Sequence, residues 1–320
     1  MTRCSIIIPV YNKAHLTRQC LDRILKEPPK CSFEIIVADD GSSDGTQTLL
    51  AGYGNQIRVV THPSNKGFAT TCNDGAAAAE GEYVLFLNND TVPFLGWLDT
   101  LVEYIQARPQ VGTVGSKLLY PNGTIQHAGV AICQDFWPRH IYVGLPADHP
   151  AVNKARRMQA VTGACMLLPR ELFQRLGGFD TVFINCYEDI DLCLRLDALG
   201  YEIHYCPQSC LIHFESVSEG RHDKEIYSGD IFLRRWKEKL RPDDLRYYTE
   251  DGLFRITYDS TSLVFELSPE VGLVKKRAEF REIEKLLCQR SLQVQTLLRE
   301  NVLLRAASSG TLATITSSAN

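Results

Sequence analysis

A short polar run, Asn88-Asn89-Asp90, directly follows an apolar stretch at 83–87. Carboxylate and amide oxygens suit hard cations such as Mg²⁺ and Mn²⁺, which commonly share their sites with substrate phosphates. The same residue types are also ordinary turn formers at the end of a strand. A single carboxylate is a small basis for a metal site, so both interpretations of Asp90 stay open on these residues alone.

A second group of carboxylates, Glu188, Asp189 and Asp191, opens a segment with helical periodicity. Negative charge at the start of a helix is stabilised by the helix dipole and by unpaired N–H groups. Asp191 can also form an ordinary helix-surface pair with Arg195, four residues later. Three carboxylates within four residues exceed what capping requires. Asp189 is therefore a candidate general base, with capping as the alternative.

Two further features suggest other chemistry. His213 follows a short apolar run and is either a metal ligand or an ordinary residue at the edge of the core. The segment 41–45 matches the G-x-S-x-G nucleophile pattern, which leaves a serine hydrolase built on Ser43 open. Against a hydrolase, Asp39 and Asp40 would place negative charge beside an activated serine oxygen.

The elements that must position these residues repeat one pattern over the first ninety residues, an apolar run followed by a polar turn and a helical stretch. Strands are predicted at 5–10, 33–38, 57–61 and 83–87, and helices at about 14–26, 44–53 and 66–80. This alternation is typical of βαβ units with parallel strands. Ligands of such sheets bind beyond the carboxyl ends of the strands, so we expect the polar residues after each strand to converge on one edge.

The rest of the chain is less regular. From about 92 to 160 the periodicity loosens, as in a substrate loop or a long connection. A further helix is predicted from Glu188 to Gly200. We predict an α/β domain at 1–240, a connecting segment at 241–272 with a hairpin at 253–267, a helix at 273–306 and a disordered tail at 307–320.

The predicted C-terminal helix has a heptad repeat. Its apolar residues at heptad spacing are Phe280, Ile283, Leu287, Val294, Leu297 and Leu304. Such a repeat is typical of a coiled coil, which would make the chain a homodimer through 280–304. The alternative is a single amphipathic helix that packs on its own domain.

Composition excludes several classes of protein. With 34 basic and 38 acidic residues the net charge is −4, which gives no reason to expect a nucleic acid as partner. We expect neither a signal peptide nor a membrane span, because no apolar run is long enough. The eleven cysteines contain no C-x-x-C pair and favour reduced thiols in a cytoplasmic protein. A P-loop and a complete dinucleotide fingerprint are both absent from the sequence.

Seven motifs, in this order and spacing, resemble the family 2 glycosyltransferases over about residues 4–220. They are Ser5–Asn12, Ile36–Thr46, Asn65–Ala69, Leu85–Thr91, Gly177–Asp180, Glu188–Arg195 and His213. Gln126–Gly129 and the aromatic and basic patch Phe136–His140 also resemble an acceptor-side insertion of bacterial, rhamnosyltransferase-like cell-surface polysaccharide transferases.

The resemblance implies a GT-A fold, an α/β architecture with a Rossmann-like, mostly parallel central sheet, flanking helices and, here, a C-terminal helical extension. It implies an inverting enzyme that uses Mg²⁺ or Mn²⁺ to transfer a sugar from a UDP- or dTDP-sugar to a hydroxyl of a glycan or lipid-linked acceptor. Polysaccharide biosynthesis would place it in the cytoplasm, with peripheral contact to the inner face of the membrane. A non-catalytic nucleotide- or glycan-binding module is the alternative outside the enzymes.

The resemblance also implies roles for individual residues. The residues implied to bind the nucleotide are Pro9, Tyr11, Asn12, Asp39, Asp40, Lys66, Gly67, Asn88 and Asn89. Asp90 and His213 are the implied metal ligands, and Asp189, beside Glu188, is the implied general base. Asn88 stands where many relatives have the first aspartate of a D-x-D motif. An amide adds no negative charge, so we expect weaker metal binding than in those relatives.

Overall fold

The computed structural model describes residues 3–183, 186–214, 221–258, 263–268 and 300. The chain divides into two units, 1–251 and 252–320. In the second unit, β13 (Phe254–Tyr258) and β14 (Leu263–Leu267) form an antiparallel hairpin. The predicted helix at 273–306 lies outside the described residues except for residue 300. The predicted tail at 307–320 lies wholly outside them. The homodimer contact through 280–304 therefore stays a prediction.

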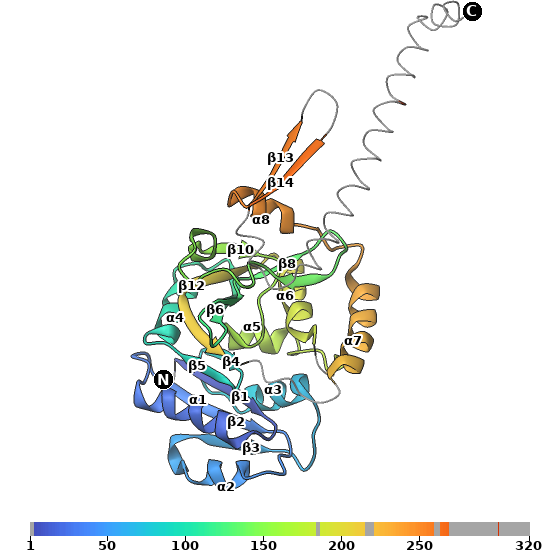
Figure 1. Ribbon diagram of the computed structural model, residues 1–320. Coiled ribbons are helices and arrows are strands. Elements are labelled where there is room, and N and C mark those ends of the chain that lie inside the picture. The colour runs from blue at the N-terminus through green and yellow to red at the C-terminus, as the bar shows by residue number, and fades with distance from the viewer. Residues whose placement is uncertain (1–2, 184–185, 215–220, 259–262, 269–299, 301–320) are drawn as a thin grey trace, which may run out of the picture. The chain divides into compact units, whose positions relative to one another are not determined.

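Four of the ten strands of the central sheet are those that the sequence predicts. These are β1 (Cys4–Val10), β2 (Phe33–Asp39), β3 (Arg58–Thr61) and β4 (Tyr83–Leu87), joined through α1 (Ala14–Lys26), α2 (Thr46–Ala51) and α3 (Phe68–Ala77), with a 3₁₀ turn at Gly54–Gln56. β1 lies between β2 and β4 and is parallel to both, while β3 continues beside β2 (Figure 1). The carboxyl ends of these strands therefore meet at one edge.

The other six strands of the sheet are mixed in direction. They are β5 (Thr91–Pro93), β6 (Val111–Leu119), β7 (Ile125–His127), β10 (Arg156–Met158), β11 (Cys165–Pro169) and β12 (Glu202–His213). β6 and β12 are parallel to each other, but β11 is antiparallel to both of its neighbours, β4 and β6. Only the β1–β4 part is therefore parallel throughout. A separate hairpin pairs β8 (Val130–Ile132) with β9 (Pro138–His140), and a 3₁₀ turn spans Pro150–Asn153.

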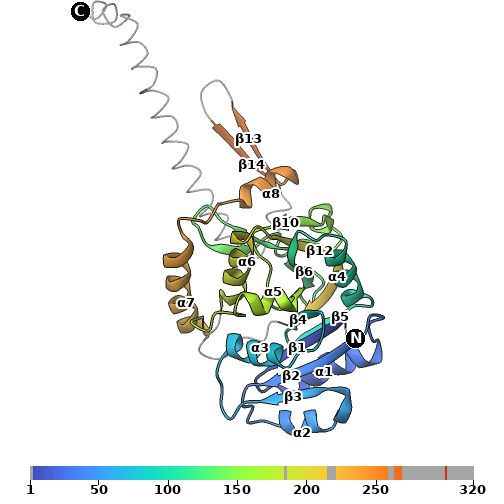
Figure 2. The ribbon, with the colours of Figure 1, turned by 180° about the vertical axis from the view of Figure 1, so that it is seen from behind.

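Helices cover both faces of the sheet, because the buried strands are apolar on both sides. α1 and α4 (Trp97–Gln106) pack on the face that bears Ile6 and Ile8. The opposite face is covered by α3, α5 (Arg170–Arg175) and α6 (Glu188–Ala198) (Figure 2). Gly75 lets α3 approach closely, since a Cβ there would lie 2.6 Å from a methyl carbon of Ile7.

The helix α8 (Asp244–Glu250) follows α7 (Arg221–Trp236) in the first unit. A second, smaller apolar cluster joins α6 to α7. Its buried members are Ile132, Phe183, Leu194, Phe232, Trp236 and Leu240. Among the described residues, ten cysteines are free thiols, and no helix is both long and apolar enough to cross a membrane.

Candidate active site

The loops after β1, β2 and β4 meet at one edge of the sheet. Val10 is opposite Asp39 in the parallel pairing of β1 with β2, so the residues after both strands lie side by side. β11 runs in the reverse direction beside β4, with Cys165 opposite Leu87. The residues that precede β11 therefore lie at the same edge as those that follow β4, which brings together segments distant in sequence.

Asp40 fixes the loop that precedes α3. Its carboxylate accepts hydrogen bonds from the N–H groups of Lys66 (2.8 Å) and Gly67 (3.0 Å), and it lies 2.8 Å from Nδ1 of His62. The other ring nitrogen of His62 lies 2.9 Å from Asp74. The structure thus brings Asp40, Lys66 and Gly67 together, with the carboxylate of Asp40 turned toward this loop.

Asp39, unlike Asp40, has one carboxylate oxygen without a hydrogen-bond partner among the described residues. Its Oδ1 accepts the N–H of Ser42 at 3.0 Å, whereas Oδ2 is buried without a hydrogen-bond partner among the described residues. A buried carboxylate oxygen without a partner is costly, so it indicates a position where a ligand or water donates. Of the two aspartates, Asp39 retains the acceptor that a nucleotide base would need.

Asn12 holds the turn that follows β2. It adopts a left-handed conformation (φ 57°), its N–H donates to the hydroxyl of Ser42 (2.8 Å), and its side-chain oxygen accepts the N–H of Ser43 (2.8 Å). The preceding ring of Tyr11 is 48% exposed and so can stack on a planar ligand. Pro9 lies within β1, opposite Ala38 of β2.

Ser43 is not paired with a histidine in this arrangement. It is exposed, and its described hydrogen bond runs from its N–H to Asn12. His62 lies between Asp40 and Asp74, and His213 lies between Asp90 and another polar side chain. Within the described residues, the serine-hydrolase hypothesis therefore finds no base for its nucleophile.

His213 ends β12 next to the polar run after β4, because β12 pairs with β5 and places His213 opposite Thr91. Its Nε2 lies 3.1 Å from Oδ1 of Asp90 and 3.2 Å from the side-chain nitrogen of Asn88. Asn89 is turned elsewhere, since its amide donates to the hydroxyl of Thr17 in α1 (2.9 Å). Asn88, Asp90 and His213 thus form one cluster, and Asn89 anchors a helix beside it.

Asp90 and His213 fit two ligands of one cation. Adjacent ligands of an octahedral Mg²⁺ with bonds of about 2.1 Å are about 3.0 Å apart, close to the 3.1 Å between these two atoms. No group of three His, Cys, Asp or Glu side chains that could hold a metal ion occurs in the described part of the chain. A cation bound here would complete its shell with phosphate oxygens, water or the amide of Asn88.

Asp189 lies at the same edge of the sheet. Its Oδ2 accepts the N–H of Gly163 at 2.7 Å, and the carbonyl of the next residue, Ala164, accepts the N–H of Asn88 at 3.0 Å. A Cβ on Gly163 would lie 3.3 Å from the Cβ of Asp189 and 3.7 Å from the ring of Phe68, the residue after Gly67. Gly163-Ala164 thus links Asp189 to the Asn88 cluster and to the loop held by Asp40.

Glu188 has a different environment from Asp189. It is buried, with 7% of its surface exposed, and it lies close to Cys72 of α3. Burial raises the pKa of the Cys72 thiol, and the nearby carboxylates of Glu188 and Asp40 raise it further. Cys72 therefore stays protonated at neutral pH, and Glu188 is a buried neighbour of the edge rather than an exposed base.

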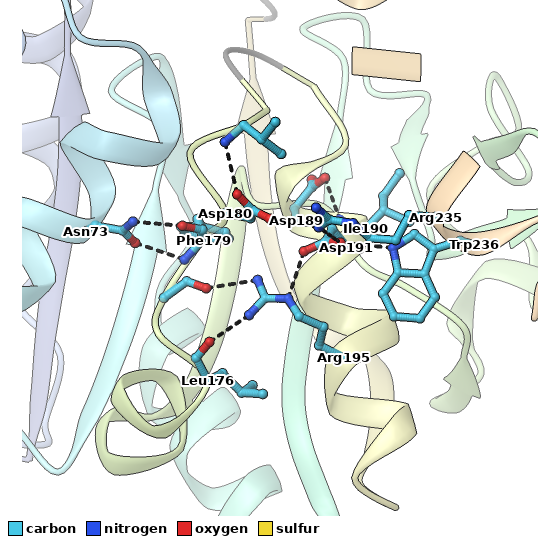
Figure 3. A network of polar contacts seen from close by, with 12 residues as sticks. Asn73, Leu176, Phe179, Asp180, Asp189, Ile190, Asp191, Arg195, Arg235 and Trp236 are labelled. Atoms are coloured by element: carbon cyan, nitrogen blue, oxygen red, sulfur yellow. Dashed lines mark hydrogen bonds and ion pairs between the residues drawn. The ribbon is translucent and has the colours of Figure 1, made fainter. Parts of the chain in front are cut away.

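Asp191 anchors the start of α6 to two other segments (Figure 3). Its fully buried carboxylate accepts hydrogen bonds from Arg195 (2.7 Å) and Arg235 (2.8 Å) and from the indole N–H of Trp236 (2.9 Å). Arg195 also donates to the carbonyls of Leu176 (2.9 Å) and residue 178 (2.8 Å). The predicted pair of Asp191 and Arg195 is present, within a larger network that also holds α7.

Arg235 extends this network to Asp180, whose carboxylate it contacts at 2.8 Å (Figure 3). Burial alone would raise the pKa of Asp180, but the N–H of Val182 and the guanidinium of Arg235 outweigh burial and hold it below its ordinary value. Asn73 of α3 holds the same turn through both backbone groups of Phe179 (2.8 and 2.9 Å). The turn before α6 is thus fixed from both sides.

Asp191→Asn is expected to destabilise the fold by about 3 kcal/mol, because one amide oxygen cannot replace a carboxylate that pairs with two buried or half-buried arginines. Urea unfolding measures this loss as a lower midpoint at unchanged slope. Asp230→Asn is the matched control on α7, since that side chain is 69% exposed and forms a surface pair. Equal midpoints for the two variants would contradict a stabilising role for the network.

Several residues of this site could not be identified from sequence motifs. His62, Asp74, Arg235 and Trp236 belong to no motif, and only the folded chain brings them to the edge or its supports. Gln126 belongs to a segment that resembles an acceptor-side insertion, yet its side chain contacts His213. Contacts of this kind depend on the pairing of distant strands, which local patterns do not encode.

Comparison with protein families gives one match, to a model described as glycosyl transferase family 2, over residues 5–177. Among curated proteins, the O-antigen biosynthesis protein RfbC of Myxococcus xanthus is 35% identical over 84% of this chain. The chain spans only 21% of that relative's length. The N-acetylglucosaminyl-diphospho-decaprenol L-rhamnosyltransferase of Mycobacterium tuberculosis is 27% identical over 65% of this chain and 78% of its own length.

Two solved structures share the fold. A mannosyltransferase from Pyrobaculum calidifontis, in complex with GDP-Man and Mn²⁺, has a TM-score of 0.54 and 22% identity over 78% of this chain and 69% of its own. GalNAc-T7, with UDP, GalNAc and Mn²⁺, has a TM-score of 0.56 and 15% identity over 78% of this chain and 55% of its own. These likenesses confirm the predicted GT-A fold.

Proposed function

The chain belongs to glycosyl transferase family 2, and from this membership we propose that it is an inverting glycosyltransferase. It transfers a sugar from a UDP- or dTDP-sugar to a hydroxyl of a glycan or lipid-linked acceptor. The main support is one observation: Asp189 lies at the same edge as the Asp90–His213 pair and is linked to it through Gly163-Ala164. A base and a cation site side by side are what displacement of a diphosphate requires.

At the donor end, Asp39 accepts a hydrogen bond from the nucleotide base through its buried Oδ2, and the exposed ring of Tyr11 stacks on that base. Pro9 and Asn12 support the surrounding turn, and the loop at Lys66-Gly67 borders the sugar or the phosphates. Asp90 and His213 would hold the divalent cation. Once bound, Mg²⁺ or Mn²⁺ neutralises the charge that develops on the leaving nucleoside diphosphate.

At the acceptor end, Asp189 removes the proton of the attacking hydroxyl. The acceptor oxygen forms a bond to the anomeric carbon as the bond from that carbon to the diphosphate oxygen breaks, and the nucleoside diphosphate leaves with the electron pair. The acceptor proton moves to a carboxylate oxygen of Asp189, which can accept it because each oxygen has more than one lone pair. A single displacement inverts the anomeric carbon and needs no covalent intermediate.

The names of two relatives support an inference about the biosynthetic process in which this chain acts. The names of the Myxococcus and Mycobacterium relatives refer to O-antigen biosynthesis and to rhamnosyl transfer onto a decaprenol-linked acceptor. We infer that this chain acts in surface polysaccharide synthesis, in the cytoplasm or at the inner face of a membrane. A deoxyhexose donor such as a dTDP-sugar, and a lipid-linked glycan acceptor, follow from that setting.

A panel of UDP-, dTDP- and GDP-sugars with Mn²⁺ tests this function. We expect one donor class to raise the thermal midpoint, because a ligand present at 100 times its dissociation constant adds about 2.7 kcal/mol. The stabilising donor is then incubated with polyprenyl-diphosphate-linked sugars, and the product is identified by mass spectrometry. Labelling of Ser43 by a fluorophosphonate, or donor binding with no transfer to any acceptor of the panel, would contradict the proposal.

A further inference from the structure

Gln126 reaches the side of His213 that faces away from the cation site. It lies in β7, is only 3% exposed, and places Oε1 2.7 Å from Nδ1 of His213. Its Nε2 lies 3.5 Å from the carbonyl oxygen of the same histidine. Both ends of the amide thus face one residue, His213.

This arrangement fixes which atom of the amide is the acceptor. If Gln126 were turned over, its oxygen would face the carbonyl oxygen of His213, and two acceptors would oppose each other. In the observed orientation, Nδ1 of His213 donates to Oε1 of Gln126. The neutral ring then has its proton on Nδ1 and its lone pair on Nε2.

Of the two neighbours of the other ring nitrogen, the amide nitrogen of Asn88 agrees with this tautomer, and the carboxylate of Asp90 agrees with it when a cation lies between the two acceptors. Nε2 lies 3.2 Å from the amide nitrogen of Asn88, which is a donor, and 3.1 Å from Oδ1 of Asp90. A lone pair on Nε2 accepts from Asn88 and lies on the same side as the carboxylate. This is the side on which a cation would bind both Asp90 and His213.

We propose that Gln126 is a positioning residue that holds His213 in the Nδ1-protonated tautomer, with the lone pair of Nε2 directed at the cation site. The proposal rests on the metal site of the proposed function. Ligating histidines generally donate their second N–H to such a partner, and loss of the partner typically weakens metal affinity 10- to 100-fold. The segment at 126–129 thereby gains a role at the donor side of the reaction.

The backbone of β7 does not depend on the side chain of Gln126. β7 is held by its pairing with β6, where His127 is opposite Leu118 and Ile125 is opposite Leu119. The carbonyl of Gln126 also accepts from Nδ1 of His140 at 3.0 Å, a contact that a substitution preserves. Removal of the amide therefore tests the side chain rather than the strand.

The experiment compares Gln126→Leu, which removes the acceptor at similar volume, with Gln126→Glu, which keeps it. Gln134→Leu is the matched control, since Gln134 lies in the loop between β8 and β9 and donates to Asp244 instead. Mn²⁺ affinity is measured by electron paramagnetic resonance without nucleotide, and the His213 tautomer by ¹⁵N NMR without metal, with His213→Gln to assign its signals. Thermal unfolding of each variant checks folding.

We expect Gln126→Leu to bind Mn²⁺ at least ~10-fold more weakly, while Gln126→Glu and Gln134→Leu stay near the wild type. An Nε2-protonated His213 in the wild type would overturn the proposal even if no variant folded. Unchanged Mn²⁺ affinity in folded Gln126→Leu would overturn this proposal alone. A wild type with no Mn²⁺ binding would overturn it together with the metal site of the proposed function.

Discussion

Asp189→Asn is expected to transfer sugar at least ~100-fold more slowly than the wild type, with nearly unchanged affinity for the nucleotide sugar. General base catalysis contributes ~10²- to 10⁴-fold, and an amide cannot take the proton of the acceptor hydroxyl. Asp189 contacts the backbone at Gly163, whereas Asp39, the proposed partner of the nucleotide base, contacts Ser42, so donor affinity has no reason to fall. Single-turnover rates and calorimetric donor binding separate the two effects.

Asp197→Asn is the matched control for this variant. Asp197 lies on the same helix, is 51% exposed, and pairs with Arg157 on the surface, where such a contact contributes little. It should transfer sugar at the wild-type rate. Asp189→Asn also changes the acceptor of the Gly163 N–H, so its thermal midpoint must be measured. Full activity in a folded Asp189→Asn would remove Asp189 from its role as base.

Asp90→Asn is expected to lose both Mn²⁺-dependent donor binding and at least ~100-fold in transfer, the largest combined effect of the predicted variants. Asp90 supplies the one carboxylate of the proposed cation site, and stabilisation of transition-state charge by such a cation amounts to several kcal/mol. Titration of Mn²⁺ in the presence of the donor measures the affinity. Excess Mn²⁺ should restore part of the lost rate.

Asn88→Asp makes the opposite change, because it adds a carboxylate to the proposed cation site instead of removing one. It adds a second carboxylate beside the same Nε2 of His213, which lies 3.2 Å from the amide nitrogen of Asn88 in the wild type, and should tighten Mn²⁺ binding. Chelation by EDTA should lower wild-type transfer to about the residual rate of Asp90→Asn and change that residual rate little. Transfer that survives chelation undiminished in the wild type would contradict a role for the cation.

The first part of the fold could be predicted because its signals are local. The strands β1 to β4 and the helices between them are each a short apolar run or a helical segment bounded by Gly, Pro or Asp. The position of β11 could not be predicted in this way, since its antiparallel pairing with β4 and β6 joins residues far apart in the sequence. The mixed part of the sheet is therefore known only from the structure.

Like the fold, the site could be predicted from the sequence only in part. The rule that ligands bind beyond the carboxyl ends of parallel strands brings the residues after β2 and β4 to one edge, as the structure has them. The rule does not distinguish Asp39 from Asp40, because their difference lies in which backbone N–H groups face each carboxylate. It is also silent on Gln126, whose neighbour His213 is contributed by a different strand.

The reversed direction of β11 determines which contacts of the site depend on the peptide before this strand and which parts of the chain lie outside them. The peptide before this strand accepts from Asn88 through the carbonyl of Ala164 and donates to Asp189, the proposed base, through the N–H of Gly163, so adjacent residues hold both parts of the proposed site. The exposed turn at 121–123 lies outside this link. Substitutions or length changes in this turn are therefore expected to leave the spacing of the proposed base and cation site unchanged.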